Sequence, residues 1–124
     1  MAQSLQGNLT KKAHQRVKFT EEQIVELNKC MDPKNGPLYF MTQYSMIQHP
    51  TKGSMKFEMY DYQKRLVGTY HDNRFAIAML PRQTGKTTCA SGYLIWYAMF
   101  KPDSQILIAA HKYAGASDIM SRVR

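Results

Sequence analysis

Residues 80–88, with the sequence LPRQTGKTT, lie between two apolar runs, and this arrangement limits the fold more than any other feature. The run before them, 75–80, suits a buried strand, and the run after them, 89–100, suits a core helix. Gly85, Lys86 and Thr87 match the end of the phosphate-loop pattern G-x-x-x-x-G-K-[ST]. A G-K-T triplet also occurs by chance in turns, but here it has the strand–loop–helix context that the pattern demands. We therefore predict a phosphate-binding loop.

The chemistry of such a loop assigns a role to each residue type. Gly85 lets the backbone approach a phosphate with no Cβ in the way, and backbone N–H groups at the helix N-terminus point at the β-phosphate. Lys86 neutralises β/γ charge, and the Thr87 hydroxyl ligates Mg²⁺. We predict that ATP and Mg²⁺ are the cofactors. The loop residues expected to bind them are Pro81, Arg82, Gln83, Thr84, Gly85, Lys86, Thr87 and Thr88.

The loop departs from the standard pattern at its start. Leu80 stands where the first glycine is expected, and Arg82 follows two residues later. A guanidinium inside the loop can stabilise charge on the transferring phosphoryl group, as an arginine finger supplied in cis does. Arg82 and Lys86 are therefore the predicted catalytic residues.

An adenine site is predicted on the preceding helix. A glutamine amide can accept from adenine N6 and donate to N7, so Gln63 is the candidate reader of the base. Tyr62 is the candidate ring to stack on it, with Tyr60 second. The alternative is an ordinary amphipathic helix with Tyr62 in the core.

Composition favours an anionic partner. The chain has 124 residues, enough for one domain, and a formal net charge of +8. That charge suits nucleotide or nucleic acid, although a solvated basic surface is the plain alternative. Two distant cysteines, Cys30 and Cys89, indicate a reducing compartment. The scattered histidines have no metal-ligand spacing, and no apolar run approaches the ~20 residues of a membrane span.

Periodicity and turn signals divide the chain. We expect a basic arm over 1–18 and a helical subdomain over 19–55, with the start of an ATPase domain over 56–124. Thr20 and Gln23 form a predicted capping box. The expected helices are 21–31, 37–48, 60–71, 86–100 and 114–124, and 56–59 is a short extended piece. Two buried strands, 74–80 and 105–110, complete a βαβ unit and predict an α/β fold with a parallel sheet.

Three segments resemble the large terminase subunit of tailed bacteriophages of the myovirus type: DYQ at 61–63, RQTGKTT at 82–88 and IAAHK at 108–112. The LYF stretch at 38–40 is similar to the family's N-terminal subdomain. The resemblance covers about residues 30–124. It implies a partial P-loop NTPase (RecA-like/ASCE) parallel sheet preceded by a small helical subdomain.

The resemblance also implies a motor that packages double-stranded DNA into procapsids, with a nuclease domain that cuts the concatemer. The implied partners are the portal, a small terminase subunit and further copies of the chain in a ring, with no membrane. The implied location is the host cytoplasm and, transiently, the portal vertex of the procapsid.

The chain departs from that family because no acidic residue lies at the end of the predicted strand 105–110, where a Mg²⁺ aspartate and a catalytic glutamate are expected. We therefore expect an N-terminal fragment that hydrolyses ATP poorly alone. Two alternatives remain: a fragment of a superfamily 2 DNA helicase, or a non-enzymatic basic module that binds nucleic acid or a partner. Helicase loops usually carry small residues and glycine where this chain has Arg82 and Gln83.

Overall fold

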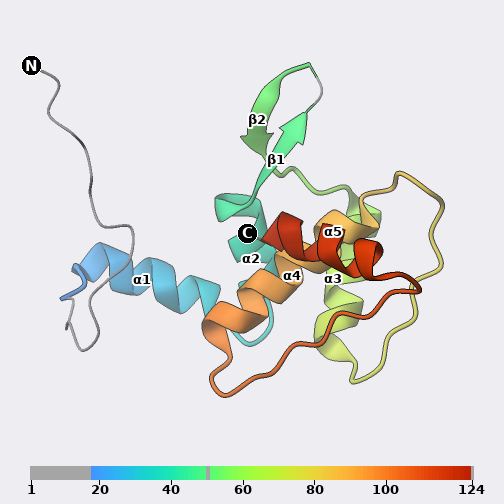
Figure 1. Cartoon of the computed structure of the whole chain (residues 1–124). Helices are drawn as coiled ribbons and strands as arrows, with labels where there is room; N and C mark the ends of the chain where they lie inside the picture. Colours follow the sequence, from blue (N-terminus) through green and yellow to red (C-terminus); the bar gives the residue numbers. More distant parts are fainter. Residues whose placement is uncertain (1–17, 50, 124) are drawn as a thin grey trace, which may run out of the picture.

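The computed structural model describes residues 18–49 and 51–123. Within them five helices and one short hairpin follow in the order α1 (Glu21–Cys30), α2 (Gly36–Tyr44), β1 (Met46–His49), β2 (Gly53–Lys56), α3 (Asp61–Asp72), α4 (Lys86–Phe100) and α5 (Tyr113–Val123) (Figure 1). The predicted basic arm lies outside the described residues apart from Lys18.

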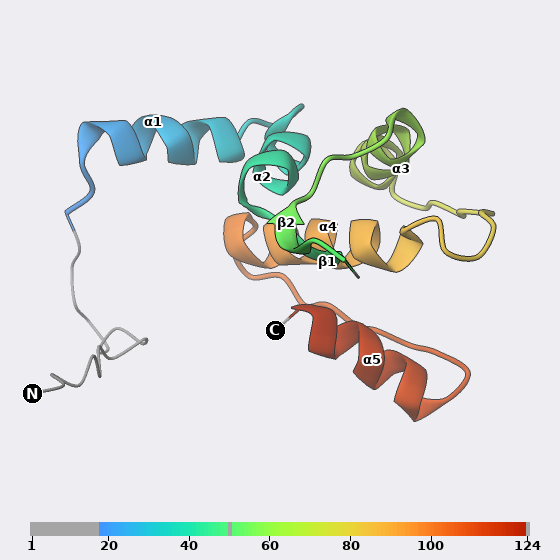
Figure 2. The same cartoon turned by 90° about the horizontal axis from the view of Figure 1, so that it is seen from above.

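Helix α4 is the centre of the molecule. Helices α2 and α3 contact it on one side and α5 lies on the other, while α1 contacts α2 and extends outward (Figure 2). The core gathers where α2, α3 and α4 meet, and its most buried apolar side chains are Met41, Val67, Cys89 and Trp96. Helices α2 and α4 approach closely, because a Cβ on Gly92 would lie 2.7 Å from the Met41 side chain.

Local signals explain the helix boundaries. The predicted capping box is confirmed, since Thr20 N–H donates to Gln23 Oε1 at 3.0 Å and Gln23 N–H donates to Thr20 Oγ1 at 3.4 Å. Pro37 lies in the first turn of α2, as expected. That helix ends at Tyr44 rather than residue 48, because Ser45 is extended and leads into β1. Strand β1 pairs antiparallel with β2, with Ile47 opposite Met55.

The predicted parallel sheet is wrong. The described residues hold a two-stranded antiparallel sheet, and neither 74–80 nor 105–110 is assigned to a strand. Phe75, Ile77 and Met79 are 82%, 92% and 92% exposed, and Leu107 is 92% exposed. A strand is defined by the hydrogen bonds of a neighbour, and an apolar run does not itself supply one. Over residues 18–49 and 51–123 the fold is therefore mostly helical with a small hairpin, and these residues do not form the P-loop NTPase sheet.

Candidate phosphate-binding loop

The predicted loop leads directly into α4, and glycine is required at the junction. Gly85 is the N-cap residue, in the left-handed region with φ +76°. A Cβ there would lie 2.6 Å from Gln63 Nε2. The backbone conformation and the close approach of the glutamine therefore each select glycine.

The first turn of α4 has no side-chain cap and no acidic residue. The first N–H groups of a helix lack intrahelical partners, and the helix dipole places partial positive charge there. The N-terminus of α4 therefore has the chemistry that accepts a phosphate.

Lys86 folds back over the loop. Its Nζ donates to the carbonyl oxygen of Leu80 at 2.9 Å, and the residue is half-buried. A second bond, from Thr84 Oγ1 to the Pro81 carbonyl at 3.0 Å, closes a smaller ring inside the same loop. The ammonium is thus held beside the helix N-terminus by a neutral carbonyl. A charged phosphate oxygen would accept a stronger hydrogen bond from it than this carbonyl does.

Gln83 gives the loop a strained backbone. Its φ of +61° lies in the left-handed region, which few residues other than glycine adopt. Such strain costs on the order of 1–3 kcal/mol and is found most often at functional sites. Gln83 and Arg82 are both exposed, so neither side chain is committed to the core.

Two residues of α3 hold the loop from the side. Tyr62 Oη donates to the Thr84 carbonyl at 2.9 Å, and Gln63 Nε2 donates to the same oxygen at 3.1 Å. Gln63 Oε1 also accepts from the Tyr60 N–H at 3.0 Å, and the side chain is 4% exposed. Both ends of the Gln63 amide therefore already have protein partners.

The structure thus places Tyr62 and Gln63, the residues predicted to bind adenine, against the predicted loop. It also gives Gln63 a structural role in holding the loop, which the sequence did not predict. The donor and acceptor of the glutamine amide predict a reader of adenine, while in the structure Gln63 Nε2 donates to the Thr84 carbonyl and anchors it. No sequence signal indicates this bond, because Gly85 faces the amide only once the tertiary fold brings α3 and the loop together.

Tyr60 and Tyr62 form an aromatic pair beside the loop, to which Tyr62 is hydrogen-bonded. Their rings stack with centroids 5.8 Å apart and planes 8° apart. Tyr60 is 68% exposed and Tyr62 37%, so the pair is available to a planar ligand rather than enclosed in the core. The interpretation of Tyr62 as an ordinary core residue is therefore not supported.

The chemistry of the loop residues is compatible with a nucleotide and a magnesium ion, for which Thr87 would supply a hydroxyl. Thr87 is half-buried in the first turn of α4. Mg²⁺ prefers a few protein oxygens together with water and phosphate oxygens, so a single hydroxyl is compatible with it. Over residues 18–49 and 51–123 there is no group of three or more His, Cys, Asp or Glu side chains that could hold a metal ion.

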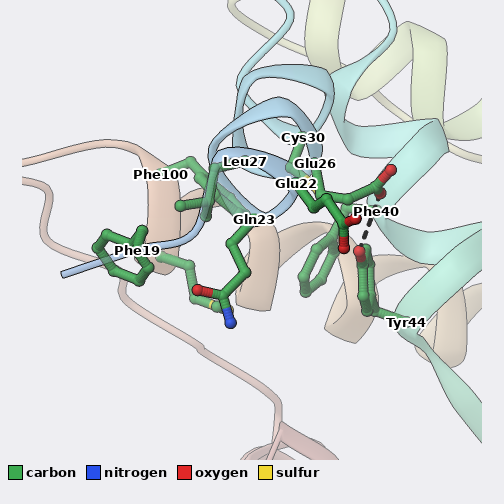
Figure 3. A pocket seen from close by; sticks show the side chains of 10 residues that line it. Phe19, Glu22, Gln23, Glu26, Leu27, Cys30, Phe40, Tyr44 and Phe100 are labelled. Carbon is green, nitrogen blue, oxygen red and sulfur yellow. Dashed lines mark hydrogen bonds between the residues drawn. The ribbon is translucent and has the colours of Figure 1, made fainter. Parts of the chain in front are cut away.

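A separate groove of about 460 Å³ lies where α1, α2 and the end of α4 meet (Figure 3). Phe40, Tyr44 and Phe100 line it, and Glu22 and Glu26 supply carboxylates at its wall. An acidic wall does not suit a phosphate, so this groove is not an alternative nucleotide site.

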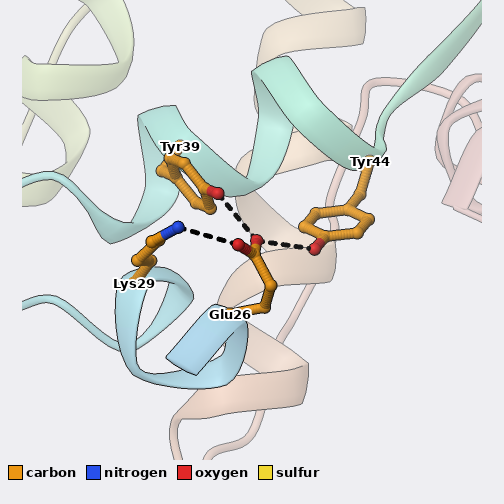
Figure 4. A network of polar contacts seen from close by, with 4 residues as sticks. All are labelled: Glu26, Lys29, Tyr39 and Tyr44. Carbon is orange, nitrogen blue, oxygen red and sulfur yellow. Dashed lines mark hydrogen bonds and ion pairs between the residues drawn. The ribbon is translucent and has the colours of Figure 1, made fainter. Parts of the chain in front are cut away.

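Glu26 in that wall is the centre of a polar network between α1 and α2 (Figure 4). Its carboxylate accepts from Lys29 Nζ at 2.8 Å, from Tyr39 Oη at 2.7 Å and from Tyr44 Oη at 3.1 Å. The hydrogen bond from Lys29, followed by that from Tyr39, lowers the pKa of Glu26 from 4.5 to about 2. The same carboxylate raises the pKa of Lys29. These satisfied groups fasten α1 to α2.

No protein-family model matches the chain. Within the described residues, none of the helices is both long enough and apolar enough to cross a membrane.

Proposed function

We propose that this chain is the ATP-binding part of a terminase large subunit, the motor that packages double-stranded DNA into phage procapsids. The observation that carries the proposal is the start of α4. There Gly85 caps the helix in the left-handed conformation, no side chain accepts from its first turn, and Lys86 lies over the loop at 2.9 Å from the Leu80 carbonyl. The start of α4 supports nucleotide binding, and the terminase assignment rests on the resemblance of segments 61–63, 82–88 and 108–112. The parallel sheet that the resemblance implies is not formed by the described residues, so it lends the proposal no support.

ATP supplies the phosphoanhydride bond, and the residues of the chain bind and orient it. The N–H groups at the start of α4 and the Lys86 ammonium would hold the β- and γ-phosphates, with Thr87 on the Mg²⁺ side. Tyr62 with Tyr60 offers the base a stacking surface, and the amide of Gln63 fixes the Thr84 carbonyl beneath it. Hydrolysis belongs to the intact motor. Its proposed partners are double-stranded DNA, the portal and a small terminase subunit, in the host cytoplasm and at the portal vertex.

Removal of the Lys86 ammonium tests nucleotide binding directly. A charge-assisted contact contributes roughly 1.5–3 kcal/mol, so we expect Lys86→Ala to weaken MgATP binding by a factor of roughly 10 to 100. The measurement is calorimetric titration of the 124-residue chain with MgATP. Lys52→Ala removes the same charge from the exposed hairpin turn and is the matched control. Equal affinity of the two variants would refute the loop assignment.

Arg82 tests whether the loop also acts on the transition state. Its guanidinium is exposed and lies three residues before Gly85. A finger that meets only transition-state charge leaves binding intact, so in a hydrolysing full-length protein Arg82→Ala should lower kcat by at least about tenfold with little change in nucleotide affinity. A fall in affinity as large as the fall in kcat/KM would make Arg82 a ground-state ligand instead.

A further inference from the structure

A second cavity, of about 440 Å³, lies between α2, the β1–β2 hairpin and α4, and Arg122 of α5 also lines it. Its volume falls in the range of small-molecule pockets in proteins. Apolar side chains that include Phe40, Phe57 and Ile95 form most of the wall. Its polar residues are Tyr44, Ser45, Gln48, Thr88, Ser91 and Arg122. An apolar wall with a few convergent polar groups is the usual composition of a ligand site.

Ser91 carries the buried polar atom in this wall that lacks a partner. The residue is 4% exposed, and its Oγ has no hydrogen-bond partner among the described residues. Buried hydroxyls are almost always hydrogen-bonded, because an unmet one loses its hydration without compensation. Since Ser91 lines the cavity, a molecule inside it can supply the missing acceptor.

Arg122 makes the cavity electropositive. No acidic side chain is found among the described residues that line it, in contrast to the groove that holds Glu22 and Glu26. Arg122 is paired with Asp118 through a half-exposed contact of 3.3 Å, and Asp118 does not itself line the cavity. Because Asp118 compensates part of the charge of Arg122, this guanidinium suits a ligand with one negative charge better than a ligand with two.

We propose that this cavity binds a monoanionic amphiphile, a medium-chain carboxylate, with its chain against the apolar wall and its head group toward Ser91 and Arg122. A carboxylate has two oxygens in the geometry of the guanidinium fork. Its remaining acceptor capacity satisfies the Ser91 hydroxyl. The proposed contacts, Ser91 and Arg122, do not belong to the phosphate loop, although Thr88 of that loop also lines the cavity.

Equilibrium dialysis of the full chain against decanoate, below its micelle concentration, tests the site. We expect saturable binding of one decanoate per chain. Arg122→Gln should weaken it about tenfold, and Ser91→Ala about fivefold, as expected for one charge-assisted and one neutral hydrogen bond. Decanol, which has the chain without the charge, should bind at least about tenfold more weakly than decanoate.

Two control variants separate the site from general effects. Arg65→Gln removes the same charge from the exposed surface of α3, and Ser117→Ala removes an exposed serine hydroxyl from α5. Both should leave decanoate affinity unchanged. Circular dichroism of each variant checks that the helices are retained. The proposal is overturned if decanoate does not saturate, if decanol binds equally well, or if Arg65→Gln weakens binding as much as Arg122→Gln does.

Discussion

The two ends of α4 differ in how completely their polar groups are satisfied. At the C-terminal half, Trp96 is 1% exposed, its Nε1 donates to the Cys30 carbonyl at 2.8 Å, and its ring stacks on Tyr93 at 5.8 Å. At the N-terminus, the first turn has no side-chain cap and Lys86 bonds only to a neutral carbonyl within the described structure. One end holds the helices together, and the other keeps donors available to a ligand.

Along this one helix, the C-terminal half contributes to the stability of the fold and the N-terminus is available to bind a ligand. Groups that already have partners contribute to the fold and gain little from a ligand, whereas donors without a strong acceptor gain most when an anion arrives. Substitutions at the C-terminal half should therefore change the free energy of unfolding, and substitutions at the loop should change ligand affinity.

The largest expected effect is at Trp96. Truncation of a buried aromatic side chain costs roughly 3–5 kcal/mol, so Trp96→Ala should unfold at a much lower urea concentration than the wild type. Trp96→Phe keeps an aromatic ring but loses the bond to the Cys30 carbonyl, and it should have an intermediate midpoint. The measurement is urea unfolding followed by circular dichroism. Lys86→Ala should keep the wild-type midpoint. If its midpoint were as low as that of Trp96→Ala, the N-terminus of α4 would stabilise the fold as much as the C-terminal half does, and the contrast between the two ends would be wrong.

The next largest effect is expected at Gln63, because this residue contributes both to the packing of α3 and to the conformation of the loop. Its amide joins the start of α3 to the Thr84 carbonyl, and loss of a buried partner costs roughly 1–3 kcal/mol. Since the anchor acts through the loop, Gln63→Ala should weaken ATP and GTP binding by similar factors. A reader of adenine would lose affinity for ATP alone, so a competition titration decides between the roles.

A second substitution at Gln63 sharpens this test. Gln63→Glu keeps an acceptor for the Tyr60 N–H but places a carboxylate oxygen opposite the Thr84 carbonyl. Two acceptors repel each other there, so the loop should loosen more than in Gln63→Ala. If Gln63→Glu binds nucleotide better than Gln63→Ala, the anchoring bond to Thr84 is not important for the loop.

Local sequence signals predicted the helices well. The Thr20 and Gln23 capping box, Pro37 in a first turn and the apolar run after Lys86 each depend on residues close in sequence. Helices form from such contacts, so α1, α3, α4 and α5 lie within about two residues of their predicted bounds.

The sheet could not be predicted in the same way, because strands need partners from elsewhere in the chain. The apolar segments 75–80 and 105–110 satisfied the composition of buried strands, yet Ile77 and Leu107 are each 92% exposed. The partner of Gln63 was missed for a related reason. The bond to the Thr84 carbonyl joins two segments that only the tertiary fold brings together.

The smallest effect is expected at Glu26, because its hydrogen-bonded network lies at the surface of the protein. Its pKa is lowered from 4.5 to about 2 by the hydrogen bonds from Lys29, Tyr39 and Tyr44. A carboxyl whose folded pKa lies below its unfolded pKa stabilises the fold above the unfolded value, and this contribution is lost as the pH falls through the folded value. The loss should therefore occur between about pH 4.5 and pH 2. Because the network is exposed, solvent and salt screen it and the change should be small.

Glu26→Gln isolates that contribution. The variant keeps an acceptor for the tyrosines but carries no charge to titrate, so its urea midpoint should fall less than that of the wild type between about pH 4.5 and pH 2. Glu22→Gln removes a carboxylate from the same helix and is the matched control. Added salt should reduce the difference between wild type and Glu26→Gln, since screening weakens the Lys29 contact. Identical pH profiles of wild type and Glu26→Gln at low salt would mean that the charge of Glu26 does not stabilise the α1–α2 junction. Hydrogen-bonded polar groups at that surface would then contribute nothing measurable to the free energy of unfolding, unlike the buried contacts of Trp96.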